Sequence, residues 1–349
     1  MKKKHIEEKK FSKDHPKISN KTGVLIINLG TPDGYDYFSV RKYLKEFLSD
    51  NKVIEVNPII WQIILNLFIL TFRPKSTGQK YKEIWLHDKN ESPLRYYTKL
   101  QSEKLQIIVN TKYSNLIVDY AMRYGNPSIE DKIQSLLKQG CTKLMFIPMY
   151  PQYCAATTAT VNDEIYRVLK KIRWQPDARI VAPYHDNKLY IKALISTIIK
   201  HKESLLWKPD AILSSYHGIP QIYFDKGDPY PCFCRKTNRL FGEELKRQGV
   251  DIPNHFSFQS RFGPKEWVKP YTEDVINELL KQGVKNLLVI TPGFSADCIE
   301  TLEEVDIEYR DLFIKNGGQN FSLTPCLNDS NESLQLINSL LENNLWQDT

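Results

Sequence analysis

One histidine of this sequence stands where a histidine could do chemistry. His217 lies in the segment SSYHGIP, at the end of an apolar stretch and directly before a Gly-x-Pro turn. Near neutral pH an imidazole in such a place can bind a metal ion or accept a proton. A purely structural histidine is the alternative, and the residues that the fold brings to His217 must decide between these roles.

An acidic segment, ADCIETLEEVDIEYRD, supplies the second set of reactive side chains. Its carboxylates recur at intervals of three, four and four residues, at Asp297, Glu300, Glu304 and Glu308. On a helix this spacing puts them on one face, where like charges repel each other. A purely structural helix would rarely carry such a face. The pattern indicates a ladder of carboxylates that binds cations or relays protons, with a solvated acidic face as the alternative.

An apolar segment, PIIWQIILNLFILTF, covers residues 58–72 and is followed by Arg73 and Lys75. It is shorter than the roughly 20 residues that a membrane-spanning helix needs. A buried core helix is one interpretation. The other is an exposed lip that touches a membrane or a flat apolar ligand. The two cations beside it suit a ligand with an apolar body and carboxylate edges.

Several common functional motifs are missing from the sequence. It has no GxGxxG, no GxxxxGK(S/T), no GxSxG and no HExxH, which argues against nucleotide cofactors, a serine nucleophile elbow and a zinc protease site. The six cysteines include no Cys-x-x-Cys pair. Cys232 and Cys234 form a Cys-x-Cys pair, for which we expect solvent-facing thiols rather than a metal site.

Composition limits the class of protein and the partners that the sequence allows. The chain has 349 residues, of which 41% are hydrophobic and 26% charged, as expected for a globular protein of two domains. The net charge is +7, but five lysines fall within the first ten residues, so we expect no nucleic-acid partner. No signal peptide, transmembrane helix or disulfide framework is expected. These features predict a cytoplasmic protein, or one at the inner face of the membrane through its apolar segment.

Strands and helices alternate along the chain. Short apolar stretches predict buried strands at 23–30, 116–122, 143–150, 178–184, 211–217, 255–260 and 285–292. Helical patterns lie between them, for example at 130–140 and 273–283. This alternation is typical of βαβ units that build a parallel sheet with helices on both faces.

The chain also repeats itself. Three pairs of segments match in the same order: NLGTP with YHGIP, MRYGNP with SRFGP, and SLLKQGCTKLMFIP with ELLKQGVKNLLVIT. Two copies of one α/β unit, with a cleft between them, explain the matches. Ligands of parallel α/β sheets bind beyond the carboxyl ends of the strands. His217 ends one such strand and Pro292 ends another, just before the acidic segment, so we expect both to face the cleft.

At these residues the sequence resembles the ferrochelatase family, whose members insert ferrous iron into a porphyrin. The resemblance covers residues 22–325 and rests on an ordered set of motifs: NLGTP, YLKEFLSD, SPL, AMRYGNP, YPQY, YHGIP, GDPYP, QSRFGPKEW and DCIETLEEVDIEY. It implies an α/β protein with two similar Rossmann-like domains, each a parallel four-stranded sheet flanked by helices, and an interdomain cleft for the porphyrin.

The resemblance also implies a division of the chain and roles for single residues. We expect a disordered basic arm at 1–20, an N-terminal domain at 21–185 with an apolar lip at 58–75, a C-terminal domain at 186–325 and a C-terminal helix at 330–349. His217 and Glu300 match the catalytic pair, and together with Glu304 and Glu308 they match the metal-binding residues. Matches to the family's porphyrin pocket fall at Leu29, Arg73, Tyr81, Ser92, Arg123 and Trp267.

Two departures from the family pattern concern cysteine. Cys298 stands where some members carry a second histidine. Some members hold a 2Fe–2S cluster on C-terminal cysteines, but the tail at 335–349 has none, so we expect no such cluster.

The expected function is insertion of Fe²⁺ into protoporphyrin IX with release of two protons, the last step of haem synthesis. No cofactor beyond the substrate iron is expected, and we expect a monomer that touches the membrane surface transiently. Two alternatives stay open: a chelatase for another tetrapyrrole or metal, such as coproporphyrin or cobalt, and a haem-binding protein without enzymatic activity.

Overall fold

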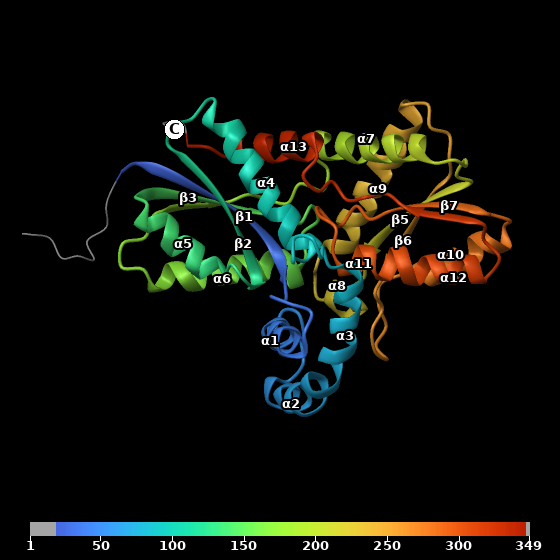
Figure 1. Cartoon of the computed structure of the whole chain (residues 1–349), viewed down its shortest axis with the longest axis horizontal. Coiled ribbons are helices and arrows are strands. Elements are labelled where there is room, and N and C mark those ends of the chain that lie inside the picture. Colours follow the sequence, from blue (N-terminus) through green and yellow to red (C-terminus); the bar gives the residue numbers. More distant parts are fainter. Residues whose placement is uncertain (1–18, 347–349) are drawn as a thin grey trace, which may run out of the picture.

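The computed structural model describes residues 19–346, so the expected basic arm at 1–20 lies almost entirely outside the described residues. Two parallel four-stranded sheets lie at opposite ends of the molecule (Figure 1). The first, in the order β2-β1-β3-β4, contains β1 (Lys21–Thr31), β2 (Leu116–Gly125), β3 (Cys141–Pro148) and β4 (Asp177–Ile180). The second, in the order β6-β5-β7-β8, contains β5 (Ala211–His217), β6 (Asn254–Gln259), β7 (Asn286–Ile290) and β8 (Asn320–Leu323). The predicted pair of α/β units is confirmed, since the two orders are the same.

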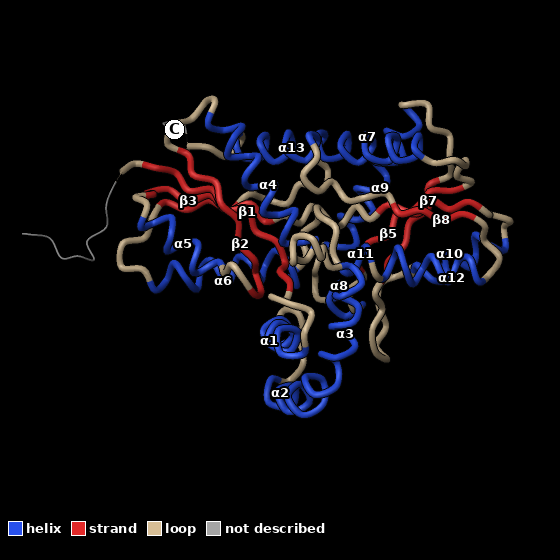
Figure 2. The backbone as a smooth tube through the Cα atoms, in the orientation of Figure 1, coloured by secondary structure: helices blue, strands red, loops and turns tan. Residues whose placement is uncertain are grey.

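Helices cover both faces of each sheet (Figure 2). The helices of the first half are α1 (Tyr37–Leu48), α2 (Pro58–Ile64), α3 (Leu70–Ile84), α4 (Pro93–Asn110), α5 (Ile129–Lys138) and α6 (Thr160–Lys171), with π-helical segments η1 (Leu65–Ile69) and η2 (Ala155–Ala159). In the second half they are α7 (Lys188–Ser204), α8 (Gln221–Asp225), α9 (Tyr230–Arg247), α10 (Thr272–Lys281), α11 (Ile299–Leu302), η3 (Glu304–Tyr309), α12 (Arg310–Lys315) and α13 (Asn331–Glu342).

Successive side chains of β1 point to opposite faces of the sheet, and this alternation explains how the two halves of the molecule join. Leu25 and Ile27 point into a core that belongs to the first half, whereas Val24 and Ile26 point to the opposite face. On that face the core continues into the second half, for example at Ile212. Helices α13 and α7 run in one row above both sheets and close this shared core (Figure 1). The domain boundary near residue 185 stays a prediction.

Glycines bring neighbouring strands close at the carboxyl ends of β1 and β5. Gly30 has φ +114°, and a Cβ there would lie 1.8 Å from the carbonyl oxygen of Tyr124 on β2. At the equivalent position after β5, a Cβ on Gly218 would lie 2.9 Å from the carbonyl oxygen of Gln259 on β6. Only a residue without a side chain fits the first position, so the NLGTP turn is set by backbone packing.

The apolar segment forms a lobe of its own. Helices α1, α2 and the start of α3 project beyond both sheets from the middle of the molecule (Figure 1). Every residue of α2 is at least partly exposed, and the exposed fraction is 62% for Leu67, 59% for Phe68 and 71% for Phe72. Leu65 and Leu70 turn inward and pack on α1. The alternative of a buried core helix therefore does not describe this segment, and within residues 19–346 no helix is long and apolar enough to cross a bilayer.

Two smaller expectations need correction. The expected C-terminal helix at 330–349 covers only 331–342, since it begins after Ser330, whose hydroxyl accepts the N–H of Ser333, and ends before Asn343. Residues 347–349 lie outside the described residues. The expectation of two solvent-facing thiols is wrong for Cys234, which is fully buried among apolar side chains of the second half, while Cys232 is exposed. Their i, i+2 spacing on helix α9 points the two thiols to different faces.

Candidate active site

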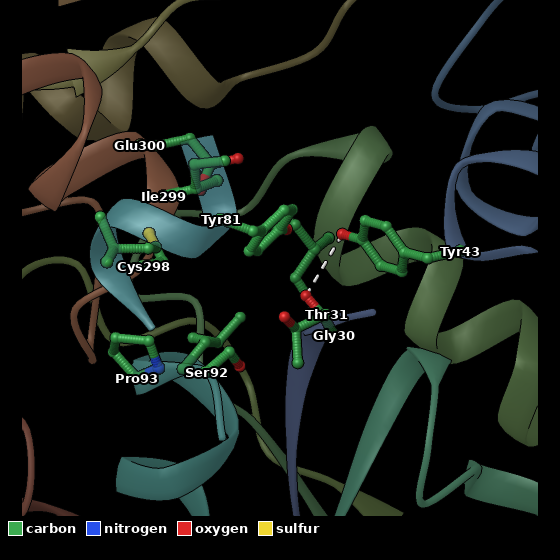
Figure 3. Close-up of a pocket in the computed structure, with 12 residues that line it drawn as sticks. Gly30, Thr31, Tyr43, Tyr81, Ser92, Pro93, Cys298, Ile299 and Glu300 are labelled. Atoms are coloured by element: carbon green, nitrogen blue, oxygen red, sulfur yellow. Dashed lines mark hydrogen bonds between the residues drawn. The ribbon is translucent and has the colours of Figure 1, made fainter. Parts of the chain in front are cut away.

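A small closed pocket lies where the end of β1 meets α3, α4 and α11 (Figure 3). The space inside is enough for about one water molecule. Its walls come from Leu29, Gly30, Thr31, Tyr43, Tyr81, Ile84, Ser92, Pro93, Leu94, Cys298, Ile299 and Glu300. The structure thus brings together three of the expected porphyrin-pocket residues, from distant parts of the chain, with the expected catalytic glutamate.

Tyrosines give this closed pocket a neutral, polar wall. The Tyr43 hydroxyl donates to the carbonyl oxygen of Gly30 at 3.2 Å (Figure 3). Burial raises the pKa of Tyr81 far above its usual range, and the negative charge of Glu300 adds to the rise. Burial also raises the pKa of Tyr43 well above its usual range. Both phenols therefore stay protonated at neutral pH, and each can donate one hydrogen bond and accept others.

A second, wider and more open pocket adjoins the first. It is lined by Lys80, His217, Ser260, Ile299, Glu300, Glu303, Glu304 and Glu308. Ile299 and Glu300 belong to both pockets, so Glu300 stands at their junction. The histidine and the three ladder glutamates, predicted from separate segments, face one shared space.

His217 is held in one orientation and, when neutral, in one tautomer. It is the last residue of β5, and its Nδ1 lies 2.6 Å from the carbonyl oxygen of Gly218. Since a carbonyl oxygen can only accept, Nδ1 must carry the hydrogen, which leaves the lone pair of the neutral ring on Nε2. Within residues 19–346 no side chain or backbone group is hydrogen-bonded to Nε2. The free nitrogen can therefore bind a metal ion or take a proton.

Asp297 does not belong to the ladder, although its spacing suggested that it does. Helix α11 begins at Ile299, so helical spacing does not apply to Asp297. Its buried carboxylate accepts hydrogen bonds from the Asn328 side chain at 2.6 Å, the Thr301 hydroxyl at 3.2 Å and the Cys326 N–H at 3.2 Å. Asp297 holds the start of α11 in place and does not line the open pocket.

Cys298, which stands in place of a family histidine, is buried at the start of α11. Its N–H donates to the hydroxyl of Thr301 at 3.0 Å, which caps the helix. Burial raises the pKa of the Cys298 thiol well above its usual range, and Glu300 raises it further. At neutral pH Cys298 is therefore an uncharged thiol in the wall of the closed pocket, a poor metal ligand.

Glu304 is fastened to the end of β6. Its carboxylate accepts hydrogen bonds from the Ser260 hydroxyl at 2.6 Å, the Tyr309 hydroxyl at 3.1 Å and the Gln259 side chain at 3.2 Å. The Gln259 amide also donates to the carbonyl oxygen of Glu300 at 2.8 Å. The second sheet thus positions two steps of the ladder at once.

Lys80 and Glu303 are the site residues that sequence reasoning missed. Lys80 Nζ lies 2.8 Å from a carboxylate oxygen of Glu303 and 2.7 Å from one of Glu308. The glutamates share a face because η3 is π-helical: the Glu308 N–H donates to the Glu303 carbonyl oxygen at 3.0 Å, an i+5 bond. Burial raises the pKa of Glu303. No pattern in the sequence singled out these two residues, because Glu303 reaches the pocket through a π-helical turn and Lys80 through tertiary packing.

The remaining expected pocket residues lie outside the two pockets. The Arg73 guanidinium stacks 4.2 Å from the ring of Phe262, and Trp267 donates from Nε1 to the Phe262 carbonyl oxygen at 2.9 Å. The Trp267 ring is 6.4 Å from the ring of His217. Trp267 therefore lies beside His217, and Arg73 reaches the same loop, at Phe262, from the other half of the chain.

Arg123, by contrast, binds only groups of the first half in the contacts that the structure shows. Its guanidinium pairs with Asp50 at 2.7 Å and donates to the carbonyl oxygen of Thr160 at 2.8 Å. Tyr124 donates to the same carboxylate at 2.9 Å. These contacts account for the charge of Arg123 without a ligand.

The described residues contain no preformed metal-binding cluster. Across the described range, no three His, Cys, Asp or Glu side chains lie close enough together to hold a metal ion as they stand. All six cysteines are free thiols. The ladder is therefore a row of separate carboxylates along one pocket rather than a closed coordination sphere.

Comparison with known protein families gives one extended match. The family model described as Ferrochelatase matches residues 21–345. The ferrochelatase of Francisella tularensis subsp. tularensis (strain SCHU S4 / Schu 4) is 53% identical over 323 residues, which cover 93% of this chain and 96% of that protein. The ferrochelatase of Francisella tularensis subsp. novicida (strain U112) is 53% identical over 322 residues, which cover 92% and 95%.

Several solved structures share the fold at low sequence identity. SirB from Bacillus subtilis with Fe³⁺ superposes with a TM-score of 0.54 at 13% identity and covers 93% of this chain and 95% of its own. CbiX, described as the terminal enzyme of sirohaem biosynthesis in denitrifying bacteria, gives a TM-score of 0.51 at 12% identity, with 93% and 100% covered. These likenesses concern the arrangement of the two sheets.

Proposed function

We propose a residue-level mechanism for this chain, which belongs to the ferrochelatase family and inserts iron into protoporphyrin. Its substrates are Fe²⁺ and the porphyrin. The observation that carries the mechanism is the meeting of His217, with a free Nε2, and Glu300 in the open pocket, where it joins the closed pocket. Metallation needs exactly these two capacities in one place: acceptance of pyrrole protons and stabilisation of a cation that loses its water.

His217 is the group that we assign to proton removal. Its Nδ1–H donates to the Gly218 carbonyl oxygen, which orients the ring and stabilises the positive charge that appears when Nε2 takes a proton. Iron coordination by the same Nε2 is the alternative role, since one lone pair cannot do both at once. Glu300 stabilises the cation and can receive the second proton.

The ladder supplies iron to this centre in our proposal. Glu308 has a side chain that is 51% exposed, and Glu304 follows it towards Glu300 along the open pocket. A divalent cation that enters from solvent meets these carboxylates one after another. Oxygen ligands that are not arranged as a closed sphere favour passage over tight binding, in agreement with the absence of a preformed metal site among the described residues.

The porphyrin edges need their own contacts. We assign Leu29, Tyr81 and Ser92 to one side of the ring, since they line the closed pocket beside Glu300. Arg73 and Trp267, which both contact Phe262, suit the carboxylate edge and the flat face of the ring. For Arg123 we propose a structural role in place of substrate contact, because Asp50 already neutralises its charge.

We also propose that the apolar lobe touches a membrane surface, where hydrophobic porphyrins partition. Leu67, Phe68 and Phe72 are exposed on one projecting lobe, and Arg73 and Lys75 follow directly. Apolar side chains next to cations are typical of segments that lie in the bilayer interface. The inner face of the cytoplasmic membrane, the monomeric state and the lack of a 2Fe–2S cluster stay predictions.

Anaerobic incubation of the protein with Fe²⁺ and protoporphyrin IX tests the proposal, with the loss of porphyrin fluorescence as the signal. Parallel reactions with coproporphyrin and with Co²⁺ separate this activity from that of another tetrapyrrole or metal chelatase. We expect the fastest metallation with Fe²⁺ and protoporphyrin. Tight binding of haem without any metallation would contradict the mechanism.

A further inference from the structure

The acidic ladder already contains a cation, the ammonium group of Lys80. Lys80 lines the open pocket together with Glu300 and Glu304. Its Nζ contacts both carboxylate oxygens of Glu303, at 2.8 and 2.9 Å, and one oxygen of Glu308 at 2.7 Å. The Lys80 side chain is 41% exposed and that of Glu303 only 7%. The ammonium therefore sits between the buried start of η3 and the solvent-facing Glu308.

The helix that carries Lys80 connects three parts of the site. Lys80 belongs to α3, which continues the exposed apolar segment. The next residue, Tyr81, lines the closed pocket. One turn further on, Ile84 and Trp85 pack against Ile299 on α11. The ion pair to Glu303 and Glu308 is thus a polar contact between α3 and the ladder, beside an apolar contact between the same elements.

A divalent ion that enters the ladder must compete with this ammonium. Glu308 offers its carboxylate to whichever cation is nearest, and two cations within a few ångströms of one carboxylate repel each other. Glu303 keeps Lys80 close, since a buried carboxylate without a counter-ion is costly. The tether returns the ammonium as soon as the divalent ion moves on.

We propose that Lys80 is a tethered cation that occupies the ladder between turnovers, so that Fe²⁺ passes by displacing its ammonium from Glu308. This inference rests on the proposed function, because it assumes that the ladder carries the iron. Lys80 is then a residue that sets metal affinity. By lowering the affinity of the ladder, it lets iron leave for the porphyrin, as multi-site ion pathways require.

Equilibrium binding of Mn²⁺ in the absence of porphyrin tests the proposal. Mn²⁺ prefers oxygen ligands, and its free form is measured by electron paramagnetic resonance. We expect Lys80→Met to raise Mn²⁺ affinity roughly five- to tenfold, since a tethered ammonium no longer competes. Lys80→Arg should stay within about twofold of wild type, because it keeps the charge and the reach. Lys82→Met is the matched control: Lys82 is exposed on the same helix, and the change in net charge is equal.

Two further variants keep the test decisive. If Lys80→Met alone fails to fold because Glu303 loses its counter-ion, Lys80→Met with Glu303→Gln removes both charges and should show the same gain. Adding Glu308→Gln to Lys80→Met should cancel the gain. In steady-state metallation, Lys80→Met should lower the KM for Fe²⁺ more than it changes kcat, a split that a merely structural ion pair would not produce.

The outcomes separate this inference from the proposed function. If Glu308→Gln weakens Mn²⁺ binding while folded Lys80→Met does not strengthen it, the ladder carries cations and the role of Lys80 is wrong. If neither Glu304→Gln nor Glu308→Gln changes Mn²⁺ binding in any background, the ladder is not a cation path, and both proposals fall. An equal gain in Lys82→Met would reduce the effect to net charge and would also overturn the inference.

Discussion

The ends of β1 and β5 are equivalent positions in the two α/β units, but their side chains serve different pockets. In the first half the sequence NLGTP places Leu29 against a closed pocket walled by tyrosines. In the second half YHGIP places His217, with a free nitrogen, in an open pocket lined by carboxylates. We propose that the porphyrin lies between the two units, so that one unit supplies a wall for the apolar ring and its copy supplies proton and metal chemistry.

The neighbouring strands show the same contrast. At the end of β2, Arg123 and Tyr124 both bind Asp50, and these contacts stay within the first half. At the end of β6, Gln259 and Ser260 donate hydrogen bonds to the carboxylate of Glu304. Where the polar side chains at a strand end bind one another, the strand end forms a rigid wall. Where they instead position a ladder carboxylate, the charge of that carboxylate is available to a passing cation.

The largest expected effect concerns Glu300, the residue at the junction of the two pockets. Glu300→Gln removes the charge at the reacting centre and should lower the metallation rate by at least about 10³-fold in a folded protein. Glu304→Gln and Glu308→Gln should cost only about two- to tenfold, mainly in the KM for Fe²⁺, because they lie further out. The series is measured by anaerobic initial rates. A loss for Glu308→Gln as large as that for Glu300→Gln would rule out a graded ladder.

The next largest effect concerns the free energy of unfolding, and it distinguishes the turn at Gly30 from the turn at Gly218. Gly30→Ala should lower the free energy of unfolding by roughly 2–4 kcal/mol, since a Cβ would lie 1.8 Å from the Tyr124 carbonyl oxygen at φ +114°. Gly218→Ala, with a Cβ 2.9 Å from the Gln259 carbonyl oxygen and 3.2 Å from the Trp267 ring, should cost about 1–2 kcal/mol. Urea titration measures both. A more damaging Gly218→Ala would mean that the β5 turn is the tighter one.

The smallest expected effect concerns the apolar lobe. Phe68→Ser with Phe72→Ser removes two exposed rings that contact neither pocket, so the rate with detergent-dispersed porphyrin should change by less than about twofold. Flotation with anionic liposomes at low salt should fall severalfold, because apolar area drives interfacial binding. Tyr166→Ser, which removes an exposed ring from α6 of the same half, is the control. Unchanged flotation of the double variant would exclude the lobe as the membrane contact.

Regular periodicity explains which parts of this structure the sequence could predict. The strands, the repeated unit and the place of His217 at a strand end follow from apolar stretches and matching segments, and the two equal sheet orders confirm the repeat. Glu300, Glu304 and Glu308 line one pocket as predicted, although the short helix α11 and the π-helical η3 replace the single regular helix on which their spacing was counted.

Departures from regularity explain the rest. Asp297 precedes the helix on which its spacing was counted. Glu303 faces the pocket because η3 is π-helical, and no pattern in a single sequence announces an i+5 turn. Lys80 is 223 residues away from Glu303, and only the packing of α3 on α11 brings them together. Arg123 matched a family position, but its ion pair with Asp50 is a tertiary contact that the match could not reveal.

The most direct test of the central claim compares the two strand ends by single substitutions in one assay. Porphyrin is bound first, Fe²⁺ is added anaerobically, and the loss of porphyrin fluorescence is followed in wild type, His217→Ala and Leu29→Ala. We expect His217→Ala to bind porphyrin normally and to metallate it about 10²–10⁴-fold more slowly, as for loss of a general base. Leu29→Ala should weaken porphyrin binding and metallate bound porphyrin within about tenfold of the wild-type rate. Turnover of folded His217→Ala within about threefold of wild type would contradict the account.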